Sequence, residues 1–226
     1  MLKAIIFDCD GIIADTEPLH LSTLQQSLRQ EGIVLTTEDY YAQYLALDDR
    51  GCYKLVYQRN GLELTEAKLS ELMRRKAESI EPIMRRELTV FPGVPDFIRT
   101  ASKRLPLAVA SGALRGEIDL ILDHAGVSSY FEAIVSAEDV TRGKPDPESF
   151  LKALSLINGR RDNTIDPAEC LVIEDSLHGV QAARMARMRC LAVTNSYDRS
   201  RLSQADIITS SLADITLSQI EIVFEY

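Results

Sequence analysis

A short apolar run that ends in two aspartates constrains the fold of this chain more than any other feature. Residues 4–7 are all apolar, which is typical of a buried strand. Asp8 and Asp10 follow two positions apart, so their side chains would point the same way, and Gly11 then allows a sharp turn. Two neighbouring carboxylates repel each other unless a proton or a cation such as Mg²⁺ lies between them. Asp-Gly pairs are also common in solvated turns, so this segment alone leaves both interpretations open.

Three later segments also place polar side chains near the ends of apolar strands. They are, in chain order, Ser111 with Gly112, Lys144 in a loop stiffened by prolines, and Glu174 with Asp175. In an open parallel sheet with helical crossovers, the carboxyl ends of the strands meet at one edge, and ligands bind there. Carboxylates, a hydroxyl and a lysine at such an edge suit a metal ion and a phosphate group.

Together these segments resemble the motifs of the haloacid dehalogenase superfamily, in its branch of phosphatases and β-phosphoglucomutases. The four family motifs are matched, in order, by residues 8–15, Ser111, Lys144 before Pro145, and Glu174-Asp175. The resemblance runs from residue 3 to about residue 210, and the motifs are spaced as the family spaces them. One such motif is a weak signal, whereas four in order are specific.

Strands and helices alternate through most of the chain. Strands are expected at residues 3–8, 106–111, 132–136, 170–174, 190–194 and 206–208, and helices at about 94–104, 115–125, 147–158 and 177–187. This alternation predicts an α/β fold with a doubly wound parallel sheet, Rossmann-like, formed by residues 1–16 and 89–226. Residues 17–88 are almost entirely helical and too long for a simple crossover. They are predicted to form an inserted helical domain, which the family places as a cap over the active site.

The resemblance implies a Mg²⁺-dependent phosphohydrolase that acts on small phosphorylated metabolites, a sugar phosphate or similar, through an aspartyl-phosphate. Asp8 would be the nucleophile, and Asp10 the general acid and base. The implied metal ligands are Asp8, Asp10 through its backbone carbonyl, Glu174 and Asp175. Ser111, Gly112 and Lys144 would bind the phosphoryl group, and Thr16 would position Asp10.

Three residues of the inserted domain are candidates for binding the substrate. Lys76 falls on the apolar stripe of a helix expected over residues 65–86, where it must either extend to water or meet an anion. Arg50 follows two aspartates, so it is either their ion-pair partner or a ligand for a distal phosphate. His20, in the first turn of a helix, is either structural or a substrate ligand. The resemblance favours Lys76 and His20, because β-phosphoglucomutases carry similar residues there.

Other activities remain as alternatives. The closest is a β-phosphoglucomutase-type phosphosugar mutase, although the Lys-Gly pair that precedes the mutase arginine is replaced here by Ala46-Leu47. Haloacid dehalogenases generally lack the second aspartate of the first motif, and phosphonatases have a different first motif. A non-catalytic metabolite-binding or interaction protein on this scaffold would have no need of Asp10.

The composition indicates the setting. A net charge of −9 with no long basic run argues against partners such as nucleic acid or anionic membranes. No apolar stretch approaches the roughly 20 residues that span a bilayer. The four cysteines lack paired spacing, so a reducing cytoplasmic location is expected. Cys9 lies between two acids but alternation turns it away from them, so it is predicted to be a core residue rather than a nucleophile. A monomer is expected.

Overall fold

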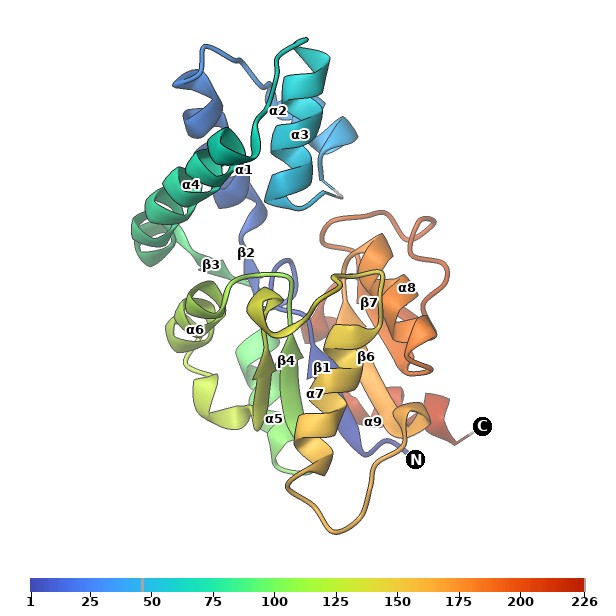
Figure 1. Cartoon of the computed structure of the whole chain (residues 1–226). Helices are drawn as coiled ribbons and strands as arrows, with labels where there is room; N and C mark the ends of the chain where they lie inside the picture. Colours follow the sequence, from blue (N-terminus) through green and yellow to red (C-terminus); the bar gives the residue numbers. More distant parts are fainter. Residues whose placement is uncertain (46, 226) are drawn as a thin grey trace. The chain divides into compact units, whose positions relative to one another are not determined.

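The computed structural model describes residues 1–45 and 47–225, so Ala46 of the Ala46-Leu47 pair lies outside the described residues (Figure 1). The chain divides into two compact units. One comprises Met1–Asp15 with Thr89–Tyr226, and the other is Thr16–Leu88. Thr16 therefore groups with the second unit, one residue from the predicted boundary.

The first unit contains a six-stranded parallel sheet in the order β5-β4-β1-β6-β7-β8. The strands are β1 (Ala4–Phe7), β4 (Leu107–Ala110), β5 (Ala133–Val135), β6 (Cys170–Glu174), β7 (Arg189–Val193) and β8 (Ile207–Thr209). All six lie within one residue of their predicted bounds. β1 and β4 are buried along their whole length, as expected of strands covered on both faces. The predicted α/β, doubly wound fold is confirmed.

The strand order places β1 at the point where the sheet topology reverses. From β1 the chain proceeds through β4 to β5 on one side, and through β6 and β7 to β8 on the other. Such a reversal opens a crevice at the carboxyl ends of the central strands, where ligands bind in this class of fold. The residues that follow β1, β4 and β6 therefore share one edge.

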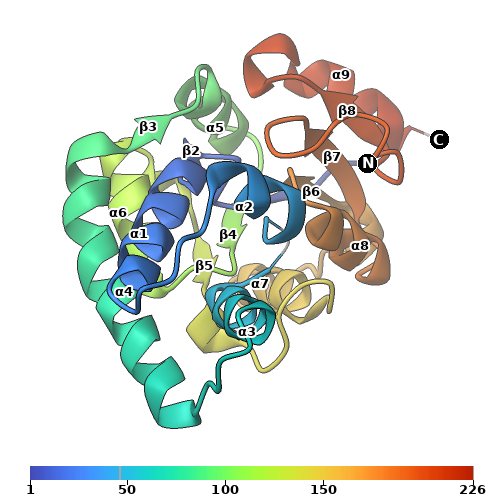
Figure 2. The same ribbon diagram turned by 90° about the horizontal axis from the view of Figure 1, so that it is seen from above.

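Helices cover both faces of this sheet. They are α5 (Val94–Ser102), α6 (Arg115–His124), α7 (Glu148–Asn158), α8 (Leu177–Met185) and α9 (Leu217–Glu221). Both views place α7 and α8 on one face and α5 and α9 on the other (Figures 1 and 2). The four predicted helices of this unit match their observed bounds within two residues. A separate antiparallel pair, β2 (Ala14–Asp15) with β3 (Thr89–Val90), joins the segments that lead to and from the second unit.

The second unit consists of α1 (Glu17–Arg29), α2 (Thr37–Gln43), α3 (Asp49–Arg59) and α4 (Glu66–Glu87). Side chains of Thr36, Asp48 and Thr65 accept hydrogen bonds from the first turns of α2, α3 and α4, which marks where each helix begins. A cluster of leucines, tyrosines and other apolar residues from the four helices forms its core. Within residues 1–45 and 47–225, no helix combines the length with the apolarity that a bilayer-crossing segment needs.

Candidate active site

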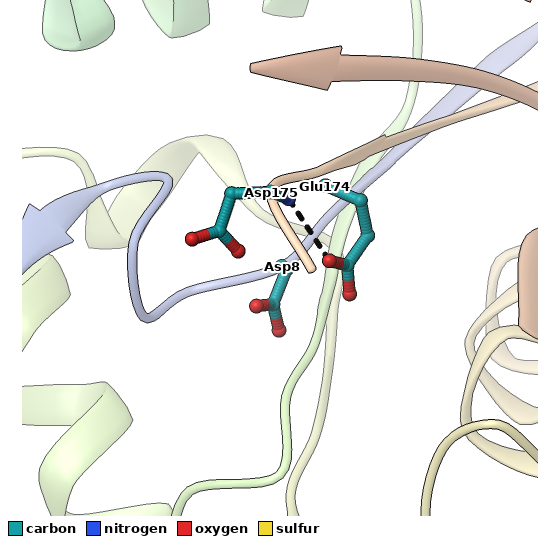
Figure 3. Close-up of side chains that lie close together, drawn as sticks. All are labelled: Asp8, Glu174 and Asp175. Carbon is teal, nitrogen blue, oxygen red and sulfur yellow. Dashed lines mark hydrogen bonds between the residues drawn. The ribbon is translucent and has the colours of Figure 1, made fainter. Parts of the chain in front are cut away.

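Three acidic side chains meet at the carboxyl ends of β1 and β6. Asp8 follows β1, Glu174 ends β6, and Asp175 is the next residue. Their ligand oxygens lie within 4.8 Å of one another, and Figure 3 shows the three carboxylates gathered around one point. Only 7% of Asp8, 0% of Glu174 and 4% of Asp175 is exposed. Burying three acids together is costly unless a counter-charge is present, so this cluster is built around positive charge.

Glu174 is held by hydrogen bonds to both of its carboxylate oxygens. Oε2 accepts from the backbone amides of Asp175 and Ser176 and from the Ser176 hydroxyl, each at 2.9 Å. Oε1 accepts from Nζ of Lys144 at 2.7 Å. A Cβ at Gly179 would lie 1.8 Å from the Glu174 carboxyl group, so only glycine fits there. Hydrogen bonds and packing therefore fix the orientation of the Glu174 side chain. Ser176 contributes two of these hydrogen bonds and was not singled out from the sequence.

Lys144 links Asp8 to Glu174. Its ammonium donates to Asp8 Oδ1 and to Glu174 Oε1, both at 2.7 Å, and lies 4.8 Å from the centre of the Phe150 ring. Burial disfavours the charged ammonium, but the carboxylates of Asp8 and Glu174 outweigh it and raise the pKa of Lys144. Lys144 is therefore a fixed positive charge beside Asp8.

Asp175 is braced by the turn that follows β7. The Ser196 hydroxyl donates to Asp175 Oδ2, and the Asn195 side-chain amide donates to the Gly11 carbonyl at 2.6 Å. Gly11 has φ +70, and a Cβ there would lie 2.0 Å from Asp175 Oδ2, so this close approach requires glycine. Asn195 and Ser196 were not predicted from the sequence, although polar residues directly after an apolar strand were the available signal.

Asp10 and Ser111 also meet at this edge. The Ser111 hydroxyl donates to Asp10 Oδ2 at 3.2 Å and accepts from the Ala113 amide at 3.0 Å. Ser111 is buried, whereas Gly112 is exposed. The structure thus brings the predicted core residues together around one edge of the sheet. Their chemical roles stay predictions.

Burial dominates the electrostatics of the cluster. It raises the pKa of Asp8 to about 7, with the carboxylates of Glu174 and Asp10 adding to the effect and Lys144 opposing it. Burial, followed by the charges of Glu174 and Asp8, also raises the pKa of Asp175 well above its usual range. The cluster therefore favours a proton or a cation. Its ligands are carboxylate oxygens, which suit a hard cation such as Mg²⁺.

Cys9 is fully buried, as predicted for a core residue. Burial and the neighbouring Asp10 and Asp8 carboxylates raise the pKa of its thiol well above the usual value. Because the thiolate is the nucleophilic form, this environment disfavours a nucleophilic role.

The candidates in the helical unit have separate environments. Lys76, in α4, is only 2% exposed, so it does not extend to water. Its ammonium contacts the Asp49 carboxylate and lies 3.1 Å from His20 Nδ1, which makes Asp49 a partner that the sequence analysis did not anticipate. Arg50 forms an exposed ion pair with Glu66 at 3.0 Å rather than with the preceding aspartates. Thr16 is 1% exposed and its carbonyl accepts from amides in the first turn of α1.

A family model described as haloacid dehalogenase-like hydrolase matches residues 5–193. The chain belongs to this family. Fructose-1-phosphate phosphatase YqaB of Escherichia coli (strain K12) is 30% identical over 191 residues, which cover 84% of this chain and 95% of that protein. The phosphorylated carbohydrates phosphatase of Thermotoga maritima is 30% identical over 82% of each chain. The predicted family and the prediction of an enzyme of the phosphatase class are therefore confirmed, and the non-catalytic alternative is set aside.

Solved structures of this family share the fold. The crystal structure of β-phosphoglucomutase from Clostridium difficile superimposes with a TM-score of 0.85, covering 100% of this chain and 98% of that chain at 21% identity. At this identity the similarity establishes the architecture and leaves the choice between hydrolase and mutase open.

Proposed function

We propose that this family member is a Mg²⁺-dependent phosphohydrolase of small sugar phosphates that works through an aspartyl-phosphate on Asp8. The observation that carries the proposal is the placement of Asp8, buried at the end of β1 with Lys144 at 2.7 Å and two further acids beside it. A carboxylate is a weak nucleophile, so it needs a site that neutralises the phosphoryl charge. The substrate class is supported by the relatives that are named for phosphorylated carbohydrates.

The first half-reaction forms the covalent intermediate. An Asp8 carboxylate oxygen attacks phosphorus, and the bond between phosphorus and the ester oxygen breaks. Asp10 gives its proton to the departing alkoxide, which leaves as the sugar alcohol. Lys144 and the Ser111 hydroxyl stabilise the charge on the phosphoryl oxygens. A Mg²⁺ bound by Asp8, Glu174, Asp175 and the Asp10 carbonyl would supply further neutralisation of that charge.

The second half-reaction frees Asp8. Asp10, now a carboxylate, takes a proton from water, and the resulting hydroxide attacks phosphorus. The bond between Asp8 and phosphorus then breaks, which releases inorganic phosphate and restores both aspartates. Asp10 returns to its protonated state, so the cycle balances.

In the helical unit, we assign Lys76 and His20 to the end of the substrate away from the reacting phosphate. Lys76 is a polar side chain on the buried apolar face of α4, only 2% exposed, and His20 is half-buried with Nδ1 3.1 Å from its ammonium. Hydrolysis is favoured over phosphosugar mutation because the Lys-Gly pair of the mutases is replaced by Ala46-Leu47. Thr16 as a positioning residue for Asp10, and Arg50 as a ligand, remain predictions from the family resemblance.

A direct experiment tests this proposal. The purified protein is incubated with fructose 1-phosphate, β-glucose 1-phosphate and p-nitrophenyl phosphate, and inorganic phosphate and glucose 6-phosphate are both measured. We expect phosphate release that stops with excess chelator and returns with Mg²⁺, and little glucose 6-phosphate. Acid quenching with ³²P-labelled substrate should trap label on the wild type and none on Asp8→Asn. Efficient isomerisation with only trace phosphate would establish the mutase instead.

A further inference from the structure

Asp49 is a carboxylate in the helical unit to which neither the family motifs nor the proposed mechanism assigns a role. It is the first residue of α3, and its side chain contacts the ammonium of Lys76. We infer that Asp49 determines selectivity: it makes the enzyme prefer monophosphate esters with a neutral, hydroxylated far end over sugars that carry a second phosphate. This inference rests on the proposed function, in which Lys76 serves the far end of the substrate.

In the ion pair of Lys76 and Asp49, the carboxylate is the more exposed of the two charges. The Lys76 side chain is 2% exposed, whereas the Asp49 side chain is 37% exposed. Two of the three ammonium donors are directed at Asp49 and at Nδ1 of His20. A solute that reaches this ion pair from solvent therefore meets the carboxylate first, and the lysine charge behind it is already balanced.

Two neighbouring sources of positive potential, the start of α3 and Arg50, are also paired with carboxylates of the helical unit. The start of α3 would attract an anion through its exposed amides, but the Asp48 carboxylate already accepts from the Gly51 amide at 2.7 Å. Arg50, the next cation along the chain, is paired with Glu66 at 3.0 Å. Lys76, the helix start and Arg50 are thus each matched by a carboxylate of the same unit.

The local charge is also felt by a neighbouring thiol. Burial raises the pKa of Cys52 to about 12, and the charge of Asp49 adds to this effect while Lys76 opposes it. The Asp49 charge acts on this buried thiol more strongly than the opposing Lys76 charge, and the carboxylates of Glu17 and Asp48 add to it. The surroundings of the ion pair are acidic on balance.

These surroundings distinguish two kinds of substrate. A carboxylate accepts hydrogen bonds from sugar hydroxyls, so a polyol end gains contacts with Asp49. A second phosphate brings further negative charge and no donors at neutral pH, and like charges brought together at a binding site are strongly unfavourable. The helical unit therefore offers hydrogen-bond acceptors to a neutral, hydroxylated end of the substrate. It offers no uncompensated positive charge at Lys76 to a second phosphate.

The test compares one sugar with one or two phosphates. We measure kcat/KM for fructose 1-phosphate and for fructose 1,6-bisphosphate, with p-nitrophenyl phosphate as the reference that has no far end. The wild type should prefer the monophosphate by about tenfold or more. Asp49→Asn keeps the side-chain shape and releases the Lys76 charge, so it should reduce this preference by about tenfold. Asp49→Glu keeps the charge and should keep the preference.

Asp48→Asn is the matched control. It removes one negative charge from the adjacent residue of the same helix start, and asparagine is as good an N-cap as aspartate. Because Asp48 bonds to Gly51 rather than Lys76, this variant should change the preference by less than about threefold. An equal effect of the Asp48 and Asp49 variants would overturn the specific role of Asp49.

Other outcomes also decide the matter. A wild type that hydrolyses the bisphosphate as well as the monophosphate overturns the inference without any variant. The inference is also overturned if the Asp49→Asn variant is folded, as judged by thermal unfolding, and keeps the wild-type preference. If Asp49→Asn does not fold, loss of the preference in Asp49→Glu would have the same force. Failure of the proposed function is distinct, because the wild type would then release no phosphate even from p-nitrophenyl phosphate.

Discussion

Each of the two units buries a lysine against carboxylates, but the balance of charge differs. In the sheet-containing unit, Lys144 donates to Asp8 and Glu174, and a third acid, Asp175, belongs to the same cluster. In the helical unit, Lys76 contacts the carboxylate of Asp49 and lies 3.1 Å from Nδ1 of His20.

The two clusters are therefore suited to different tasks. Three buried acids exceed one ammonium, so the cluster at the sheet edge retains a demand for positive charge that a divalent cation can meet. The pair in the helical unit is balanced and makes no such demand. We therefore expect changes at the sheet edge to affect chemistry and metal binding, and changes in the helical unit to affect which substrate is used.

The largest effect is expected from Asp8→Asn. The amide is nearly isosteric but cannot attack phosphorus, so kcat on p-nitrophenyl phosphate should fall by roughly four orders of magnitude or more. Thermal unfolding should show an intact fold. Near-normal turnover in this variant would contradict the covalent mechanism.

Lys144→Met should have the next largest effect, and it tests whether the buried lysine of the sheet-containing unit acts in the chemistry. Because Lys144 is proposed to stabilise the charge on the phosphoryl oxygens, its loss should lower kcat by about 10²–10³-fold at saturating Mg²⁺. Lys76→Met, which removes the other buried lysine, is the matched control on the same aryl phosphate and should change kcat by less than about threefold. An equal loss of kcat in the two variants would show that the two lysines do not have the separate roles proposed for them.

The three buried acids at the sheet edge should make the stability of the protein depend on pH. Without metal, the folded pKa of Asp8 is raised to about 7 from its usual 3.8, so between these values the folded state holds a proton that the unfolded chain has lost. The contribution of Asp8 to the free energy of unfolding should therefore decrease as pH rises from about 4 to 7, by on the order of a few kcal/mol. Urea unfolding in chelator, wild type against Asp8→Asn, isolates this contribution; parallel curves would refute it.

Ser196→Ala tests whether the acidic cluster binds Mg²⁺ through Asp175. The Ser196 hydroxyl donates to Asp175 Oδ2, so its loss should free that carboxylate to rotate and weaken Mg²⁺ binding by about 10–100-fold. Calorimetric titration of Mg²⁺ measures this directly, and raised Mg²⁺ should restore most of the activity. Ser210→Ala, which removes an exposed hydroxyl bonded to Asp214, is the control and should bind Mg²⁺ as the wild type does.

The smallest effect is expected from Lys76→Ala, and it concerns the ranking of substrates. The KM for fructose 1-phosphate should rise by about tenfold, while the rate on p-nitrophenyl phosphate, which has no far end to bind, should change little. An unchanged ranking in a folded variant would return Lys76 to a purely structural role.

Much of this molecule follows from its sequence. The strands of the sheet were predictable because an apolar run bounded by turn residues is a local signal, and the carboxyl-end rule for parallel strands then brings Asp8, Ser111 and Glu174 to one edge. The N-terminus of α4 was predictable from Thr65, a good N-cap before a periodic apolar stripe.

The partners of the charged groups depend on how the folded chain packs. Lys76 was visible as an anomaly on an apolar stripe, but its match with Asp49, 27 residues away, depends on how α3 packs against α4. The bond from Ser196 to Asp175 depends on β7 lying beside β6 in the sheet. The physical reason is that periodicity and turn preferences act over a few neighbouring residues. A hydrogen bond between distant side chains is set by the packing that brings their backbones together.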